Sequence, residues 1–286
     1  MGKIVIVGSG PAGCSAALYA ARAGQEVVMI SMGMGALSKA ELIQNYYGFE
    51  EGITGAELYR QGVAGAKAVG AEFITAEVVG LDYTGSLVVQ TTEGDYPADA
   101  VILATGTGRI APKIAGLAEH EGRGVSYCAT CDAFFYRGKT AAVLGSGEYA
   151  LHEVQALLPL AGKVILCTNG EPLTADFPEG VEICTEKLAA VEGEEKVSAL
   201  RLENGELLPV EGLFVALGVA GSAALARKLG APVENGRIVV DERMQTGIPG
   251  LYAAGDCTGG LLQVCKAVYE GALAATEAIK QIRGKK

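Results

Sequence analysis

The sequence predicts an α/β fold in which helices cover parallel sheets. Two stretches, one at the N-terminus and one beginning at Lys139, each contain a strand-like run, a glycine-rich loop, a helix-like run and a second strand-like run. Parallel strands need a crossover of this kind, so each stretch predicts a βαβ unit. Half of the 286 residues are hydrophobic, which is enough for one or two cores at about 100 to 200 residues per domain.

Composition and charge argue against several classes of function. The chain has 23 basic and 33 acidic residues, and its net charge of -10 disfavours nucleic acid and anionic membranes as partners. No apolar run approaches the ~20 residues of a membrane span. Seven cysteines are an odd number for a secreted disulfide scaffold and favour a few specialised thiols. We therefore expect a cytoplasmic protein.

The first half of the chain alternates strands and helices. Residues 3–7 and 26–30 are typical of buried strands on either side of a helix that ends at Gly24. A mostly helical stretch is expected over residues 43–71, with a loop at 45–48. Further strands are predicted at residues 73–81, 86–91 and 101–104.

The second half begins with the repeated unit. A strand from Thr140 leads into a helix from Tyr149 to Leu160, with His152 and Glu153 on its polar side. Extended runs follow, Asn204-Gly205 predicts a hairpin turn, and a helix closes the chain. The expected ranges are 163–167, 181–192, 197–203 and 211–218 for strands, 264–282 for the helix, and 110–112 and 217–218 for crossings between domains.

Gly8, Gly10 and Gly13 form a GxGxxG loop between the first strand and the first helix. Backbone N–H groups and a helix N-terminus at this place can hold a pyrophosphate, so the loop predicts a dinucleotide site. The next strand runs into Ser31 without the Asp or Glu that usually holds a ribose. Another group must therefore hold that ribose.

Gly145, Gly147 and Ala150 repeat the same spacing in the second unit. An NADPH site usually needs arginines beyond the next strand to bind the 2′-phosphate. Residues 167–172 supply none, and Glu171 would repel a phosphate. The sequence therefore argues against NADPH at this loop.

Cys128 and Cys131 form a CxxC pair followed by Asp132. A zinc site would need a second ligand pair, but the other cysteines stand singly and only two histidines are present. A two-electron disulfide couple fits better, with Asp132 able to move the proton that thiol exchange requires. The alternative for Asp132 is a helix N-cap or a surface charge. His120 is expected to be an exposed loop residue, with help in proton transfer near the pair as the alternative. Cys14, Cys257 and Cys265 are expected to fill space, with a place in the cofactor site as the alternative for the last two.

Gly255 and Asp256 close an apolar strand near the C-terminus, where an acidic side chain can accept hydrogen bonds from a ribityl or ribose hydroxyl. Taken together, the order and spacing of GSGPAG, CATCD and AAGDC match one family. Over nearly its whole length the chain resembles the low-molecular-weight thioredoxin reductases. The resemblance implies two Rossmann-like, three-layer β/β/α domains. An FAD-binding domain (residues 1–110 and 217–286) would carry an inserted nucleotide-binding-like domain (111–216) with the CxxC pair.

The resemblance also implies FAD as cofactor, a homodimer and roles for individual residues. Cys131 would lie against the flavin, Cys128 would attack the disulfide of a thioredoxin-like protein, and Asp132 would be the acid/base. No metal ligands are expected. The implied FAD contacts are Gly8, Gly10, Pro11, Ala12, Gly13, Asn45, Thr105, Gly106, Gly255, Asp256, Gln263 and Val264.

The electron donor is where the chain departs from the family pattern. Residues 167–180 are short, acidic and interrupted by prolines, without the Arg-rich segment of NADPH-using members. Reduced ferredoxin is therefore the expected donor, with NADPH as the alternative. Residues 101–140 hold five basic against three acidic side chains, a balance that suits an acidic ferredoxin. The basic residues are Arg109, Lys113, Arg123, Arg137 and Lys139.

Three other functions use the same motifs. A small-molecule dithiol oxidase would run the chemistry in reverse with oxygen as acceptor. A non-catalytic flavoprotein would use the CxxC pair as a clip or redox sensor. A ferredoxin-NADP reductase would leave the CxxC pair without a role.

Overall fold

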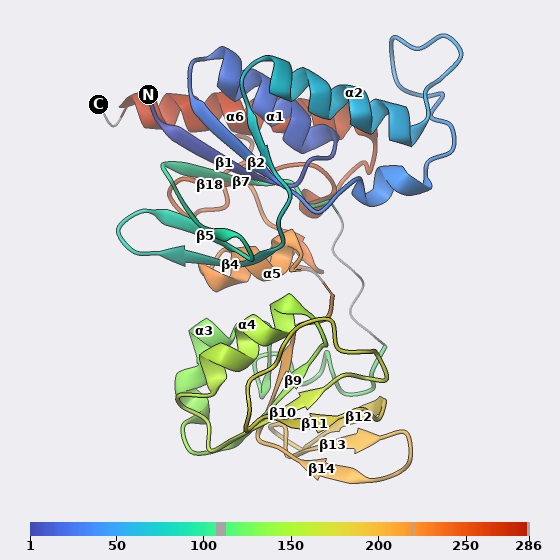
Figure 1. The fold of residues 1–286 in the computed structure, drawn as a ribbon, viewed down its shortest axis with the longest axis vertical. Helices are drawn as coiled ribbons and strands as arrows, with labels where there is room; N and C mark the ends of the chain where they lie inside the picture. The colour runs from blue at the N-terminus through green and yellow to red at the C-terminus, as the bar shows by residue number, and fades with distance from the viewer. Residues whose placement is uncertain (107–112, 219, 285–286) are drawn as a thin grey trace. The chain divides into compact units, whose positions relative to one another are not determined.

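The computed structural model describes residues 1–106, 113–218 and 220–284. The chain divides into two compact units, residues 1–108 with 221–286 and residues 109–220. Each unit combines a parallel sheet with helices on one side and a smaller antiparallel sheet on the other (Figure 1). The predicted α/β class with three layers is confirmed. The crossing expected at residues 110–112 lies outside the described residues.

The first unit is built on a five-stranded parallel sheet in the order β18-β7-β1-β2-β3. Its central strand pairs in parallel with a strand on each side, which confirms the βαβ unit predicted at the N-terminus. The strands are almost wholly apolar because both faces of the sheet are covered. Their bounds are β1 (Lys3–Val7), β2 (Glu26–Ile30), β3 (Glu72–Ile74), β7 (Ala100–Leu103) and β18 (Leu251–Ala253).

Three helices lie along one face of this sheet (Figure 1): α1 (Pro11–Arg22), α2 (Gly55–Ala68) and α6 (Val264–Gly284). Pro11 occupies the first position of α1, where its missing N–H costs no hydrogen bond. Gly271 lets α6 approach α1 closely, since a Cβ there would lie 2.0 Å from the Ala12 carbonyl oxygen. The other face carries the antiparallel strands β4 (Val78–Tyr83), β5 (Leu87–Thr91) and β6 (Gly94–Ala98).

The second unit repeats the plan with a parallel sheet in the order β11-β10-β9-β15-β8. Helix α3 (Ala129–Asp132) packs against α4 (Glu148–Leu157) beside this sheet. Asn204-Gly205 joins two antiparallel strands, so the predicted hairpin is confirmed. The strands are β8 (Val125–Ser126), β9 (Thr140–Leu144), β10 (Lys163–Cys167), β11 (Glu182–Cys184), β12 (Leu188–Glu192), β13 (Ala199–Leu202), β14 (Leu207–Pro209) and β15 (Gly212–Val215).

Three sequence-based expectations about elements were wrong. The run 73–81 is divided between β3 and β4, which belong to different sheets. Residues 43–53 form no helix, because Ile43 and Ile53 pair across a loop that turns at Gly48 and Gly52 with positive φ. The run 181–192 is two strands in different sheets. The remaining elements are η1 (Gly35–Lys39), η2 (Ala133–Tyr136), α5 (Ser222–Lys228), β16 (Val233–Glu234), β17 (Arg237–Ile238) and η3 (Asp256–Thr258). Among the helices of the described ranges, none has the length and apolar character to cross a membrane.

Candidate active site

The three glycines of the first loop have different surroundings and so are needed for different reasons. A Cβ on Gly8 would lie 2.3 Å from the Ala104 carbonyl oxygen, and one on Gly13 would lie 1.9 Å from the Gly8 carbonyl oxygen. Both positions therefore need glycine for packing. Around Gly10, by contrast, no heavy atom of the described residues lies within 4 Å of the Cβ position, apart from those of Gly10 and its two chain neighbours. Gly10 thus leaves open space at the start of α1, where an anionic group can approach the backbone N–H groups.

The turn at Gly255 is held by two charged side chains of α6. Glu270 Oε2 accepts hydrogen bonds from the backbone N–H of Gly255 at 2.8 Å and from the Thr258 hydroxyl at 2.9 Å. Lys266 donates to the Gly255 carbonyl at 2.7 Å and forms an ion pair with Glu270 at 2.9 Å. A Cβ on Gly255 would lie 3.0 Å from the Ala12 Cβ, so this turn adjoins the first glycine loop.

Sequence reasoning missed Lys266 and Glu270. The only available signal was an (i, i+4) pair on the helix that follows the glycine turn. Their side chains are 14% and 11% exposed, and this shielding from solvent comes from packing that a motif does not reveal.

Two expected cofactor residues meet across the first unit. The Asn45 side-chain amide donates a 2.8 Å hydrogen bond to the Gln263 side-chain oxygen, 218 positions away. Val264, next in the chain, begins α6 and packs with the small cluster around Ile43 and Ile53. The loop that contains Asn45 is thereby tied to the start of α6.

Thr105, another expected cofactor residue, forms hydrogen bonds with Ser222. Its hydroxyl accepts from the Ser222 N–H at 2.8 Å and lies 2.7 Å from the Ser222 hydroxyl, and its own N–H donates to that hydroxyl at 3.2 Å. Gly106 follows with φ 75°. The pairing joins two chain segments of the first unit that lie 117 residues apart.

Cys128 and Cys131 form a disulfide at the start of α3, with Cα atoms 5.3 Å apart. Cys128 is buried at 4% exposure and its Sγ accepts from the Cys131 N–H at 3.1 Å, whereas Cys131 itself is exposed. The two cysteines therefore differ in exposure to solvent, although they are only three residues apart.

Asp132 is oriented by Ser126. The Ser126 hydroxyl donates to Asp132 Oδ2 at 2.7 Å and accepts from the Cys128 N–H at 3.1 Å. Ser126 ends β8 and is buried, so one fixed hydroxyl links the predicted acid/base to the backbone of the disulfide.

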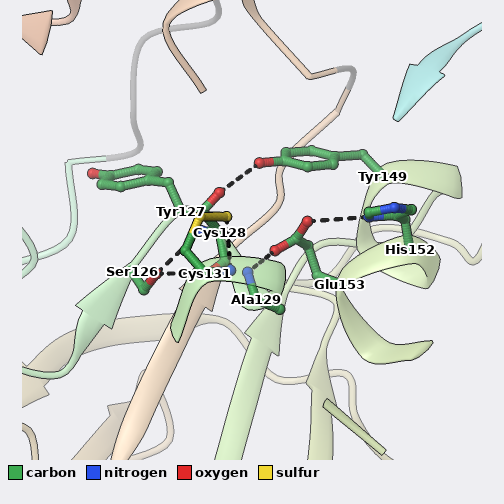
Figure 2. A network of polar contacts seen from close by, with 8 residues as sticks. All are labelled: Ser126, Tyr127, Cys128, Ala129, Cys131, Tyr149, His152 and Glu153. Carbon is green, nitrogen blue, oxygen red and sulfur yellow. Dashed lines mark hydrogen bonds and ion pairs between the residues drawn. A yellow bond between two sulfur atoms is a disulfide. The ribbon is translucent and has the colours of Figure 1, made fainter. Parts of the chain in front are cut away.

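A second polar network approaches the disulfide from α4 (Figure 2). The Tyr149 hydroxyl donates to the Tyr127 carbonyl at 3.0 Å. One Glu153 oxygen accepts from the Ala129 N–H, and the other lies 3.3 Å from His152 Nδ1. Glu153 was expected on the polar side of this helix, but it is wholly buried because α3 packs over that position.

The second glycine loop is covered by the segment that follows β10. The Thr174 N–H donates to the Ser146 carbonyl at 2.8 Å, and its hydroxyl lies 3.3 Å from the same oxygen. A Cβ on Gly147 would lie 3.0 Å from Thr174 Oγ1. The space that Gly10 leaves open in the first loop is thus partly filled by Thr174 in the second.

Comparisons with known proteins agree on one family. Residues 2–271 match the family described as pyridine nucleotide-disulphide oxidoreductase. The chain is 35% identical to a thioredoxin reductase of Aquifex aeolicus, over 99% of this chain and 94% of the relative. It is 33% identical to that of Listeria innocua, over 98% and 93%.

The chain belongs to the thioredoxin reductase family. Among solved structures it is similar to the atypical thioredoxin reductase TRi from Desulfovibrio vulgaris Hildenborough, with 40% identity, 99% of each chain covered and a TM-score of 0.93. It is also similar to a ferredoxin-flavin thioredoxin reductase from Clostridium acetobutylicum, with 35% identity, 99% and 98% coverage and a TM-score of 0.75.

Thioredoxin reductases are flavoproteins that use FAD, and this member of the family is an oxidoreductase. The first unit of this thioredoxin reductase homologue fits such a group. Gly10 faces open space, and within the described chain no side chain caps the N-terminus of α1. The Gly255 turn beside this loop brings half-buried Asp256 near the same place.

Cys14, Cys257 and His120 are buried in this family member, whereas Cys265 is not. Cys14 and Cys257 are 5% and 4% exposed, as expected for residues that fill space, and this burial raises the pKa of their thiols to about 12 and about 11. Cys265 is exposed, so the same expectation was wrong there. His120 was expected to be exposed but is buried, with its ring nitrogens 2.7 and 3.1 Å from the carbonyls of Gly116 and Gly193. The ring therefore joins two loops.

Proposed function

We propose that this flavoprotein reduces the disulfide of a thioredoxin-like protein with electrons from reduced ferredoxin. The FAD-binding domain would comprise residues 1–110 and 217–286, and the inserted domain, residues 111–216, would present the CxxC pair. We further propose that it works as a homodimer in the cytoplasm. The five free cysteines outside the pair are typical of a reducing compartment.

Bound FAD would supply a carrier that accepts electrons and passes two of them to a disulfide. The glycine loop Gly8, Gly10 and Gly13, with Pro11 and Ala12 at the start of α1, would hold its pyrophosphate. The Gly255 turn would present Asp256 to a hydroxyl of the cofactor. The expected contacts Asn45, Thr105, Gly106, Gln263 and Val264 belong to the same unit.

At the CxxC pair, two electrons and two protons would break the Cys128–Cys131 bond and give two thiols. Cys128, as a thiolate, would then attack the acceptor disulfide and form a mixed disulfide, which Cys131 would break as it closes the pair again. Asp132, held by Ser126, would take and return the proton. Because Cys128 is buried, its sulfur must become accessible before this attack.

Exposed aromatic side chains beside the pair support a protein acceptor. Phe134 and Phe135 are each 67% exposed, only three and four residues beyond Cys131. The Arg137 guanidinium lies 5.4 Å from the centre of the Phe134 ring. Exposed aromatic and arginine side chains are the groups that contribute most to protein interfaces.

The covered second glycine loop is the observation that carries the choice of donor. A pyrophosphate at Gly145 and Gly147 would have to displace Thr174, which is hydrogen-bonded to the loop through its backbone N–H. The same segment carries Glu171, whose charge opposes a 2′-phosphate. These contacts favour a donor that needs no dinucleotide pocket in the second unit.

Basic side chains on both sides of the CxxC pair in the sequence support an acidic protein as that donor. Lys113, Arg123, Arg137 and Lys139 are exposed, while Arg109 lies outside the described residues. Opposite charge would speed the encounter with ferredoxin at low ionic strength. The solved relative described as a ferredoxin-flavin thioredoxin reductase points the same way.

An anaerobic spectral experiment tests the donor. NADPH, NADH and reduced ferredoxin are added separately to the FAD-loaded protein, and the flavin absorbance is followed. We expect rapid bleaching with ferredoxin alone. Rapid bleaching by NADPH would instead make the chain a nicotinamide-dependent reductase. Oxygen uptake with small dithiols, without reduction of thioredoxin, would make it a dithiol oxidase.

A further inference from the structure

Glu153 is a buried carboxylate for which the reaction outlined above has no use. Its residue exposure is 0%, and one oxygen accepts from the N–H of Ala129, the residue directly after Cys128 (Figure 2). The other oxygen lies 3.3 Å from His152 Nδ1. As a carboxylate, Glu153 would accept in both contacts, and His152 would donate through Nδ1. Burying such a group is costly unless it is hydrogen-bonded, as it is here.

We propose that Glu153 is a positioning residue that keeps the Cys128–Cys131 dithiol strongly reducing. The proposal rests on the proposed function, in which this pair is the redox couple. Reduction breaks the S–S bond with two electrons and two protons, and one of the two thiols then loses a proton to become the attacking thiolate. A negative charge fixed beside Cys128 disfavours that thiolate. The reduced form is thereby destabilised, and electrons leave the pair more readily.

Two other charged or polar groups act on the pair differently from Glu153. Asp132 is half-buried and bonded to Ser126, so solvent screens its charge more strongly. His152 offsets the charge of Glu153 through the donated hydrogen bond, and its side chain is 20% exposed. The buried carboxylate and its histidine therefore predict shifts of opposite sign.

The test measures the sulfur equilibrium directly. Full-chain, FAD-loaded protein is equilibrated under argon in graded mixtures of reduced and oxidised dithiothreitol. The dithiol fraction is counted by alkylation and mass spectrometry of the peptide that holds both cysteines. Glu153→Gln keeps the shape and an acceptor oxygen but removes the charge. We expect the equilibrium to move about tenfold toward the dithiol, which corresponds to about 30 mV.

Two further variants interpret the result. Glu148→Gln removes the same charge about 140° round the same helix, and should leave the equilibrium unchanged within about twofold. His152→Gln should move it two- to threefold toward the disulfide, on the order of 10 mV. If Glu153→Gln does not fold, the shift in His152→Gln still tests the proposal.

An unchanged equilibrium in folded Glu153→Gln, with only a lower melting temperature, would overturn the proposal and leave Glu153 with a structural role. Shifts of the same sign in Glu153→Gln and His152→Gln would overturn it as well. Failure of the proposed function looks different. In that case the wild-type pair would equilibrate normally with dithiothreitol while the protein failed to reduce thioredoxin.

Discussion

The carbonyl oxygen of Ala104 lies 2.3 Å from the point that a Cβ atom on Gly8 would occupy, whereas the corresponding point on Gly10 faces open space. Two glycines of one loop are therefore kept for different reasons. Gly8, with φ 110°, is required by the packing of the sheet against its own loop. Gly10, with φ −70°, has a backbone that alanine can adopt.

This contrast predicts the behaviour of two alanine variants. Gly10→Ala should change the free energy of unfolding of the apoprotein by about 1 kcal/mol or less, yet weaken FAD binding at least ~10-fold, because the methyl group enters the space proposed for the pyrophosphate. Gly8→Ala should lose about 3 kcal/mol or more from strain and overlap. Urea unfolding and FAD titration measure both effects. Unimpaired FAD binding by folded Gly10→Ala would contradict the assignment of the loop.

Ser126→Ala should slow thioredoxin reduction about 10-fold and alter its pH profile. The variant removes the hydroxyl that orients Asp132 and accepts from the Cys128 N–H. Steady-state assays across pH check this. Ser198→Ala is the matched control, since Ser198 is a serine of the same unit whose hydroxyl contacts only the Glu192 carbonyl among the described partners, at 3.4 Å. If the two variants showed the same rates and the same pH profile, Ser126 would have no role in the mechanism.

Replacing Phe134 and Phe135 by alanine should raise KM for thioredoxin about 10-fold while turnover of a small aromatic disulfide stays the same. The reason is that exposed aromatics contribute to protein docking rather than to sulfur chemistry. Leu207→Ala, at another exposed apolar position of the second unit, serves as control. If both substrates slowed equally, the pair would instead be supporting the local fold.

The buried thiols predict a loss of stability at alkaline pH. Burial raises the pKa of Cys14 from 9.0 to about 12. Above pH 9 the unfolded chain therefore loses this proton while the folded chain keeps it, so stability falls as pH rises from about 9 toward 12. The contribution of Cys14 to this fall in the free energy of unfolding is at most about 1.4 kcal/mol per pH unit.

Urea unfolding between about pH 8 and pH 10.5 checks this prediction. The slope for Cys14→Ala should be shallower than that of the wild type, and the slope for Cys265→Ala, at an exposed position, should match it. A Cys14→Ala slope equal to that of the wild type would show that the Cys14 thiol is not protected from ionisation.

Local spacing allowed much of the fold to be predicted. The two βαβ units, the hairpin at Asn204-Gly205 and the CxxC pair depend on residues close in sequence, whose period and turn chemistry are local properties. The loop before α2 was harder, because the pairing of Ile43 with Ile53 overrides a pattern that looks helical.

The surroundings of the site depend on long-range packing and could not be predicted. Glu153 looked like a solvated helix residue, but α3 covers it. The sequence does not indicate that Thr174 covers the second glycine loop, because its contact with Gly147 arises only when the segment after β10 folds back. Lys266 and Glu270 contact the Gly255 turn only because the fold brings the start of α6 beside it.

Anaerobic reductive titration tests most directly whether flavin and disulfide form one electron-transfer system. FAD-loaded wild-type protein is titrated with dithionite while the flavin absorbance and the free thiols of residues 128 and 131 are followed. We expect uptake of about four electrons per chain, about two by the flavin and two by the disulfide, against about two in a Cys128→Ser variant. Complete bleaching of the wild type after about two electrons, with the disulfide intact, would contradict it.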